Sequence, residues 1–264
     1  MLAIGIRQQP VISDFSFRVI FTAVNPEASP LKHVVREALL GLSELLYPRL
    51  CAGTGEPLAP GEIGVSLRCL SGMRQTHYHR QPAGNALHRD LNERLPVVTA
   101  LGCYHYAEGE SIQRLIHQLK YNRREAIGRQ VGRFYGQMLR AEGLYPPDTA
   151  VVPIPLHPRK LLERGFNQAE RFGEGLAEGA GLSMDPAALR RVRHTKSQAR
   201  MKDASGRLMN LKGAFAAAEP APARVLLVDD GVTTGTTLLT AAEALRAAGC
   251  EELHVATIAV AGRR

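Results

Sequence analysis

Hydrophobic residues in the second half of the chain follow two alternating patterns. Short apolar runs such as Val225–Val228 are typical of strands that a parallel sheet buries on both faces. Between these runs, apolar residues recur every three or four positions, as in an amphipathic helix. Strands that alternate with helices predict an α/β fold, in which helices flank a parallel sheet. The predicted strands are residues 96–106, 150–154, 188–194, 224–228 and 253–260, and the predicted helices are residues 126–139, 167–180, 237–248 and one that Ser111 caps.

The first third of the chain lacks this regularity. Residues 1–30 show no clear pattern and predict an N-terminal extension that is either disordered or packed on the main body. Residues 31–47 predict a helix that Pro48 ends, and residues 51–94, rich in Gly, Pro and His, predict a small irregular module. We therefore divide the chain into an extension (1–30), a helix with an irregular module (31–95) and an α/β domain (96–264).

The charge distribution favours a polyanionic partner. The chain has 264 residues and a formal net charge of +8. Residues 190–212 hold eight Lys and Arg against one acid, Asp203, and residues 114–140 form a second basic stretch. Such an excess suits nucleic acid or a ligand with several phosphates, although solvated basic faces would give the same composition.

The chain carries no pattern of a membrane or secreted protein. No apolar run is long enough to span a bilayer, and Arg7, Asp14 and Arg18 interrupt the N-terminus where a signal peptide needs a continuous apolar stretch. We therefore expect a cytoplasmic protein without membrane insertion. Four widely spaced cysteines argue against a disulfide framework.

Residues 225–237, with the sequence VLLVDDGVTTGTT, hold the most specific chemistry. An apolar strand leads into Asp229 and Asp230, then into a loop of Thr and Gly, then into a helix. Backbone amides at such a helix start form a cradle for phosphate, and the two carboxylates suit the hydroxyls of an attached sugar. The alternative is an ordinary strand-to-helix turn with Asp as a cap. The loop is not a Walker A motif, because no Gly-Lys-Ser/Thr follows its glycine.

A second motif spans residues 151–168 and follows an earlier predicted strand. Its prolines stiffen the loop after that strand, and Arg159 and Arg164 offer bidentate donors that suit a pyrophosphate. The alternatives are plain turn chemistry for the prolines and an ion pair of Arg164 with Glu163 or Glu170. Asn167 then serves only as a helix N-cap and Gln168 is a surface residue.

These motifs resemble known families. The segment VDDGVTTG resembles the signature of type I phosphoribosyltransferases, which bind phosphoribosyl pyrophosphate. With VPIPL, ERGFNQ at residues 163–168, the T-x-x-Q at Thr195–Gln198 and the R-x-x-N at Arg207–Asn210, the order and spacing resemble the ComF family from about residue 45 to the C-terminus. ComF proteins are phosphoribosyltransferase-like and associated with competence and DNA uptake.

The resemblance implies roles for individual residues. It makes Asp229 and Asp230 the clamp on the ribose hydroxyls, and it makes residues 195–210 a mobile loop that closes over the ligand, with Thr195 and Arg200 among its candidates. It implies bound Mg²⁺ on the pyrophosphate and assigns no protein residue as a metal ligand. The residues implied to contact the ligand are Thr233, Thr234, Gly235, Thr236, Thr237, Arg159, Arg164, Gln168, Lys196, Gln198 and Arg207.

The irregular module departs from the family pattern. ComF proteins usually open with a zinc-ribbon-like C-x-x-C…C-x-x-C module, but here Thr54 and Ser66 replace two of the four cysteines. Cys51 and Cys69 remain, and His77 and His79 complete a ligand set by composition only, at a spacing too short for the usual finger. We therefore expect no zinc, with Cys51 and Cys69 as small buried residues. Cys103 and Cys250 are expected to be structural.

Two functions follow from the resemblance and the charge. In the first, the protein is a phosphoribosyltransferase that binds phosphoribosyl pyrophosphate with Mg²⁺ and transfers the sugar to an acceptor that the motifs do not identify. In the second, it is a non-catalytic protein that handles single-stranded DNA with the same fold and basic loop. Because aromatic residues make up only 5% of the chain, DNA contacts would be mainly to phosphates.

Overall fold

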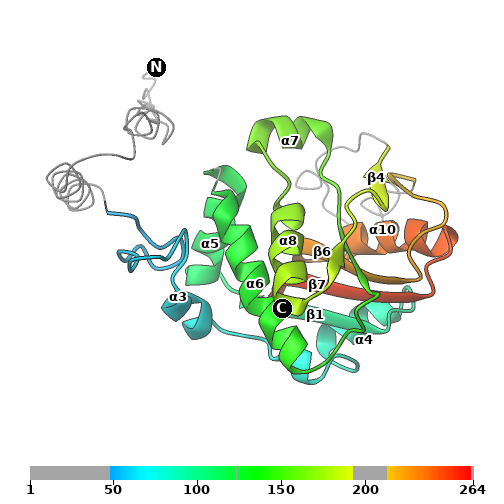
Figure 1. Cartoon of the computed structure of the whole chain (residues 1–264), viewed down its shortest axis with the longest axis horizontal. Coiled ribbons are helices and arrows are strands. Elements are labelled where there is room, and N and C mark those ends of the chain that lie inside the picture. The colour runs from blue at the N-terminus through cyan, green and yellow to red at the C-terminus, as the bar shows by residue number, and fades with distance from the viewer. Residues whose placement is uncertain (1–47, 123, 193–212, 263–264) are drawn as a thin grey trace, which may run out of the picture. The chain divides into compact units, whose positions relative to one another are not determined.

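Five parallel strands form the central sheet of the computed structural model (Figure 1). Their spatial order is β1-β7-β6-β2-β3, and every neighbouring pair runs parallel. The structure describes residues 48–122, 124–192 and 213–262, and those from Arg49 onward belong to one compact unit. The α/β fold with a parallel sheet is therefore confirmed. The strands are β1 (Thr99–Tyr106), β2 (Ala150–Pro153), β3 (Ser183–Met184), β6 (Arg224–Val232) and β7 (Glu252–Ala261).

The prediction of a parallel strand at residues 188–194 was wrong. Residues Leu189–Arg191 form β4, which pairs antiparallel with β5 (Phe215–Ala217) in a separate two-stranded sheet. The edge of the parallel sheet is instead β3, only two residues long, which pairs with Ala150 and Val151 of β2. A strand of only two residues leaves no periodic signal in the sequence.

Helices cover both faces of the sheet. On one face, α5 (Ser111–Tyr121), α6 (Glu125–Ala141) and α8 (Gln168–Ala180) pack on Leu226 and Val228 of β6. On the other face, α4 (Ala86–Asn92) and α10 (Thr236–Ala247) share a core with Val225 and Leu227. Consecutive residues of β6 thus point to opposite faces, which is the two-residue period of a strand. The expected cap at Ser111 was wrong by one position, because Glu110 is the N-cap and makes no side-chain bond to the helix.

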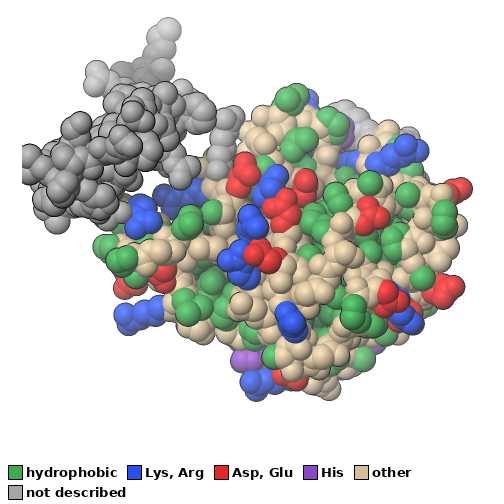
Figure 2. Space-filling model, viewed as in Figure 1, with side chains coloured by type: hydrophobic (Ala, Val, Ile, Leu, Met, Phe, Trp, Pro, Cys, Tyr) green, Lys and Arg blue, Asp and Glu red, His purple; other side chains and the backbone are tan. Residues whose placement is uncertain are grey.

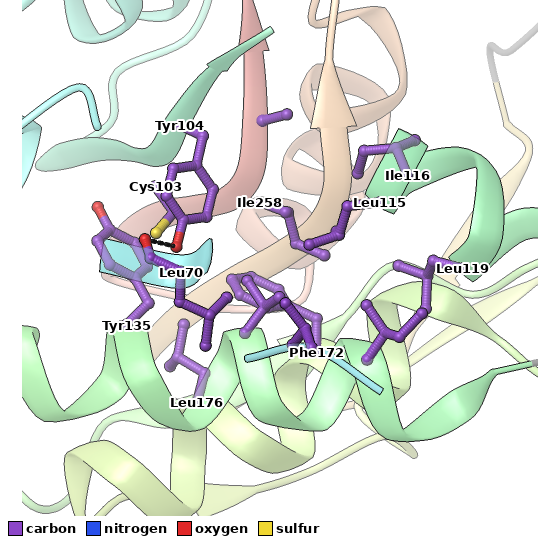
Figure 3. Packing of buried hydrophobic residues seen from close by; sticks show 14 of the residues in the cluster. Leu70, Cys103, Tyr104, Leu115, Ile116, Leu119, Tyr135, Phe172, Leu176 and Ile258 are labelled. Atoms are coloured by element: carbon purple, nitrogen blue, oxygen red, sulfur yellow. Dashed lines mark hydrogen bonds between the residues drawn. The ribbon is translucent and has the colours of Figure 1, made fainter. Parts of the chain in front are cut away.

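The core on the α5–α6–α8 face contains two buried tyrosines with satisfied hydroxyls (Figure 3). Tyr104 of β1 donates to the carbonyl of Leu70 at 2.8 Å, and Tyr135 of α6 donates to the carbonyl of Gly102 at 3.3 Å. Leu70 belongs to α3 (Leu67–Gly72), so the first bond ties the N-terminal module to the sheet. Because a buried hydroxyl without a partner costs free energy, the Tyr104 bond favours this position of the module.

Helices α6 and α8 approach each other through glycines. A Cβ atom on Gly132 would overlap the carbonyl oxygen of Phe172, and one on Gly175 would overlap the carbonyl oxygen of Arg129. Gly136 and Gly179 meet the opposite helix in the same way one turn further along. The backbones are therefore in direct contact, as small residues permit between closely packed helices.

Ion pairs cross the solvent side of the same two helices. Arg129 and Arg133 of α6 both contact Glu178 of α8, and Arg171 of α8 contacts Glu125 of α6. Figure 2 shows basic and acidic side chains interspersed on this face. Because these pairs are exposed, each adds little to stability.

The predicted irregular module, residues 51–94, is more ordered than expected. It contains α3, a 3₁₀ turn at Tyr78–Arg80 and α4. Leu87 and Leu91 of α4 are buried against the sheet. Cys51 and Cys69 are buried as expected, and the ring of His79 packs edge-on against Tyr135. The predicted extension at residues 1–30 and helix at residues 31–47 lie outside the described residues.

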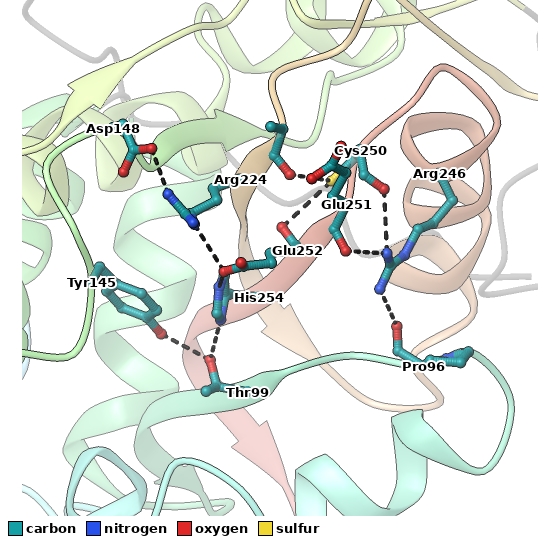
Figure 4. Close-up of polar contacts among 11 residues, drawn as sticks. Pro96, Thr99, Tyr145, Asp148, Arg224, Arg246, Cys250, Glu251, Glu252 and His254 are labelled. Atoms are coloured by element: carbon teal, nitrogen blue, oxygen red, sulfur yellow. Dashed lines mark hydrogen bonds and ion pairs between the residues drawn. The ribbon is translucent and has the colours of Figure 1, made fainter.

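The amino ends of the strands are closed by a polar network (Figure 4). Arg224 at the start of β6 contacts Asp148 at 2.5 Å and Glu252 at 3.0 Å. Thr99 links the buried ring of His254 to the hydroxyl of Tyr145. The charged groups at the amino ends of the strands are therefore paired with each other. Ligands of open α/β sheets bind at the opposite, carboxyl ends of the strands. Among the described helices, none is long and apolar enough to cross a membrane.

Candidate functional site

The sheet changes the direction of its connections between β2 and β6. From β2 the chain passes through α8 to β3 at one edge, and from β6 it passes through α10 to β7 on the other side. Because α8 and α10 cover opposite faces, the connections diverge at the carboxyl ends of β2 and β6. Open α/β sheets bind their ligands at such a switch point.

Asp229 and Asp230 lie at this switch point. Pairing of β2 with β6 ends at Pro153 and Val228, while β6 continues alongside β7 as far as Val232. The strand is thus longer than predicted and contains the two acids, instead of ending before them. Beside both carboxylates, β6 is therefore not paired with β2.

The two carboxylates have different surroundings. Asp229 accepts a hydrogen bond from the backbone amide of Asp230 at 2.8 Å. Asp230 forms an ion pair with Lys120, at the end of α5, with 3.1 Å between Nζ and Oδ2. Burial of Asp229, together with the charge of Asp230, raises the pKa of the Asp229 carboxyl to about 7, although Lys120 and Arg164 act against this rise. The pair therefore carries less than two full negative charges near neutral pH.

The loop after β6 presents backbone donors at the start of α10. Gly235 is the N-cap residue with φ of 69°, and no side chain caps the helix. A Cβ at Gly235 would come within 2.7 Å of Leu91, so both the conformation and the space require glycine. Thr233 is exposed, whereas Thr236 is buried and its hydroxyl lies 3.0 Å from that of Thr234. An uncapped helix start next to exposed hydroxyl groups is suited to bind an anion.

The loop after β2 contains a helix that the sequence analysis did not predict. Residues Pro158–Arg164 form α7, which begins with proline at its first turn and ends at Gly165 in the left-handed region. None of its residues is buried, so it has no apolar face that a periodic pattern would reveal. The expected stiff loop is therefore a short exposed helix beside the switch point (Figure 1).

Arg164 and Arg159 differ in their surroundings. Arg164 donates to the side-chain oxygen of Gln168 at 2.7 Å. Its positive charge opposes the rise in the pKa of Asp229 without cancelling it. The suggested partners Glu163 and Glu170 are not those of Arg164, since Glu163 instead pairs with Arg159 at 3.5 Å. Arg159 is exposed. The structure thus brings Arg164, and not Arg159, into the electrostatic neighbourhood of the acids.

Two neighbouring polar residues support α8 and Arg164. Asn167 is the N-cap of α8, where its side chain accepts from the amide of Ala169, and it also donates to the carbonyl of Ile154. Gln168 is 2% exposed, so the alternative of a surface residue was wrong. Its amide donates to the carbonyl of Phe166 while its oxygen holds Arg164. Gln168 therefore helps to hold Arg164 in its orientation.

Besides Arg164, three cations that the sequence analysis did not single out act on the carboxylates: Lys120, which pairs with Asp230, and Lys160 and Arg191, which interact through their charge. Burial lowers the pKa of Lys160 on α7, with added repulsion from Arg164, Arg191 and Lys120 and attraction from Asp230. Arg191 of β4 is likewise coupled to Asp229. The four groups come from α5, α7 and β4, so only the fold unites them. The one signal was the basic excess of residues 114–140 and 190–212, which contains Lys120 and Arg191.

The remaining predicted ligand contacts lie outside the described residues. They belong to the basic segment expected to close over the ligand. The residues concerned are Thr195, Lys196, Gln198, Arg200 and Arg207.

Metal binding by side chains alone has no support in the described part of the chain. Across those residues, no group of three His, Cys, Asp or Glu side chains is placed to hold a metal ion. A magnesium ion, however, is commonly held by one or two carboxylates and the phosphates of its ligand. Asp229 and Asp230 fit that pattern, because they offer two adjacent carboxylates before the uncapped start of α10.

The raised pKa of Asp229 leads to a testable prediction about stability. A carboxyl that binds its proton more tightly in the folded chain destabilises the fold as the pH rises from about 4 to about 7. We expect Asp229→Asn to be more stable than the wild type at about pH 8, by at most about 4 kcal/mol, and this gain to vanish toward pH 4. Urea unfolding at several pH values measures it. A gain that does not depend on pH would contradict the explanation, and Asp148→Asn, at an exposed acid, should show no such gain.

Comparisons with known proteins agree with this architecture. The family described as "Phosphoribosyl transferase domain" matches residues 171–264. Proteins named "DNA utilization protein YhgH" from Salmonella typhi and Escherichia coli (strain K12) are each 32% identical to this chain, with 80% of this chain and 96% of the relative covered.

A third relative broadens the comparison. "Competence protein F" from Haemophilus influenzae is 33% identical over 189 residues, which cover 69% of this chain and 79% of the relative. The matched part includes the carboxylate pair and the loop that follows it, since the family match runs from α8 to the end of the chain. The chain belongs to the ComF family of proteins with a phosphoribosyltransferase domain.

Proposed function

We propose that the protein binds phosphoribosyl pyrophosphate together with Mg²⁺ at the carboxyl ends of β2 and β6. The observation that carries this proposal is the order of groups along one short segment: two adjacent carboxylates, Asp229 and Asp230, followed by the uncapped start of α10. A sugar phosphate needs acceptors for its sugar hydroxyls and backbone amides for its phosphate. Here one short loop separates the two kinds of group.

Each part of the ligand finds a chemically suited group. The carboxylates accept hydrogen bonds from the ribose hydroxyls, and the backbone amides of residues 233–237 bind the 5′-phosphate. Lys120, Lys160, Arg164 and Arg191 provide positive charge for the pyrophosphate, and arginine suits phosphate oxygens through its planar fork. Bound Mg²⁺ would supply further neutralisation of that pyrophosphate. Burial, with added repulsion from the neighbouring cations, lowers the pKa of Lys160, and a bound anion would offset both effects.

The same groups suit transfer of the phosphoribosyl unit. Departure of pyrophosphate leaves positive charge on the anomeric carbon, which the carboxylates Asp229 and Asp230 would stabilise. The cations around them would stabilise the departing pyrophosphate. An acceptor nucleophile has no assigned group among the described residues, so ligand binding is the part of the proposal that the site supports most directly.

Calorimetric titration of the full chain tests the proposal. We expect phosphoribosyl pyrophosphate with Mg²⁺ to bind at one site per chain, more tightly than ribose 5-phosphate or pyrophosphate alone, because only the whole ligand uses the carboxylates, the cradle and the cations together. Equal affinity for pyrophosphate alone would show that the site binds anions without recognising the sugar. Absence of binding by folded protein would overturn the proposal.

A second candidate function rests on the names of the relatives and on the cations at the site. The relatives carry names that refer to DNA utilization and competence, and phosphate contacts to single-stranded DNA would use the same four cations. If all four contact phosphates, affinity for a single-stranded oligonucleotide should fall about 50-fold between about 50 and 200 mM salt. Fluorescence anisotropy measures this dependence. A slope near zero would count against a DNA role for this surface.

A further inference from the structure

Two cysteines of the N-terminal module, Cys51 and Cys69, are linked through Ser66. Cys51 lies in a tight turn, where its amide donates to the carbonyl of Glu56 at 2.8 Å. Cys69 lies in the first half of α3. Their side chains are 3% and 4% exposed, and the residues over the turn, Thr54 to Glu56, are exposed. The pair therefore sits just beneath the surface.

Ser66 is hydrogen-bonded to both cysteines. The amide and the hydroxyl of Ser66 lie 3.5 and 3.6 Å from Sγ of Cys51, and the same hydroxyl accepts from the amide of Cys69 at 3.1 Å. Both cysteines belong to the same cluster of buried core residues. On its other side the Cys69 sulfur lies close to the backbone, since a Cβ on Gly53 would come within 2.5 Å of it.

The surroundings make the two thiols unequal. Burial opposes ionisation of Cys51, but hydrogen bonds from Ser66 and Thr54 outweigh it and lower the pKa of Cys51 to about 6. Burial and the neighbouring Cys51 raise the pKa of Cys69 to about 12. Cys51 therefore ionises much more readily than Cys69. The reactive form of cysteine is the thiolate.

We propose that Cys51 and Cys69 form a reversible disulfide when the protein meets a peroxide. The Cys51 thiolate attacks one oxygen of hydrogen peroxide, the O–O bond breaks, and hydroxide leaves, so that Cys51 becomes a sulfenic acid. The Cys69 sulfur then attacks the Cys51 sulfur and loses its proton, and the sulfenic hydroxyl leaves as water. Overall, two thiols are oxidised and one peroxide is reduced to two waters.

The other two cysteines lack these features. Burial raises the pKa of Cys103 in β1 and of Cys250 after α10 above the usual range. Cys103 belongs to the core on the α5–α6–α8 face, whereas Cys250 belongs to the core on the α4–α10 face. Both therefore serve as internal controls in the same molecule, and Cys250→Ser provides a matched control variant.

The proposed disulfide would join the two cysteines that remain from the zinc-ribbon-like pattern of the family. Thr54 and Ser66, which stand in place of two cysteines, are the residues that hydrogen-bond to Cys51. Ser66, the N-cap of α3, joins α3 to the turn through its hydrogen bonds to the Cys51 sulfur. The two remaining sulfurs are then free to react with each other.

The test treats the full-length protein with hydrogen peroxide and follows it by thiol counting and intact mass. We expect the count to fall from four free thiols to two, with loss of the mass of two hydrogen atoms, a single peptide joining Cys51 to Cys69, and recovery with dithiothreitol. Cys250→Ser should form the same cross-link. Cys69→Ser should stop at a sulfenic acid on Cys51 that dimedone traps.

Three results would overturn the proposal. The first is folded wild type that keeps all four thiols, and the second is over-oxidation of Cys51 without any Cys51–Cys69 peptide. The third is native mass showing one zinc ion per chain that Cys51→Ser releases, since metal would then occupy both sulfurs. Peptide mapping of the wild type decides between the outcomes even where a variant fails to fold.

Discussion

Gly175→Ala is expected to destabilise the protein by more than about 3 kcal/mol, although alanine favours helices by about 1 kcal/mol over glycine. The added Cβ would overlap the carbonyl oxygen of Arg129, a backbone atom that no rotamer change can move. Helices α6 and α8 would have to separate, which also loosens the core around Phe172 and Leu176. Because whole domains are stable by only about 5–15 kcal/mol, this loss is a large share.

Urea unfolding measures this effect, with Gly72→Ala as the matched control. Gly72 ends α3, and a Cβ there meets no atom within 4 Å. The control should therefore unfold at the wild-type urea concentration or slightly above it. Equal midpoints for the two variants would show that α6 and α8 do not rely on direct backbone contact.

The sequence predicts elements whose pattern is local and long. Apolar residues such as Ile127 and Val131 repeat at helical spacing, and the predicted helix at 126–139 matches α6 within two residues at each end. The runs before Pro153 and Asp229 are buried on both faces, which is why they are recognisable as strands of a parallel sheet. Local pattern and burial agree in these segments.

The errors arise where a neighbour decides the structure. The end of β6 depends on β7, which continues to pair with Gly231 and Val232 after β2 has stopped. Helix α7 has an exposed Leu161 and Leu162, so its sequence carries no amphipathic signal. β3 is a strand only because β2 supplies its partner. In each case the deciding information lies in another segment of the chain.

The candidate site shows the same division. The acids and the loop after them were identified from thirteen consecutive residues, whose order along the chain is itself the signal. The cations Lys120, Lys160 and Arg191 were not, because they come from three separate elements. The alternative that Gln168 is a surface residue was wrong, because the side chain is buried and bonds to Arg164.

The second large effect concerns the carboxylate pair. We expect Asp229→Asn/Asp230→Asn to weaken binding of phosphoribosyl pyrophosphate with Mg²⁺ at least about 100-fold, because hydrogen bonds to charged groups contribute about 1.5–3 kcal/mol each. The amides keep the shape of the side chains but lose their negative charge. They also remove the buried charge and the repulsion that together raise the pKa of Asp229, so the variant should remain folded.

If the double variant is more stable than the wild type but no longer binds the ligand, the two acids serve binding and not stability. Charges that stay close together at a cost to the fold are typical of binding and catalytic sites. Asp148→Asn is the matched control, because Asp148 pairs with Arg224 at the opposite edge of the sheet. It should bind the ligand as the wild type does.

The most direct measurement is therefore a calorimetric titration of phosphoribosyl pyrophosphate with Mg²⁺ into three proteins: the wild type, Asp148→Asn and Asp229→Asn/Asp230→Asn. The account predicts equal binding by the first two and no measurable heat from the third, with all three folded. Binding by the double variant that matches the wild type, or no binding by any of them, would contradict it.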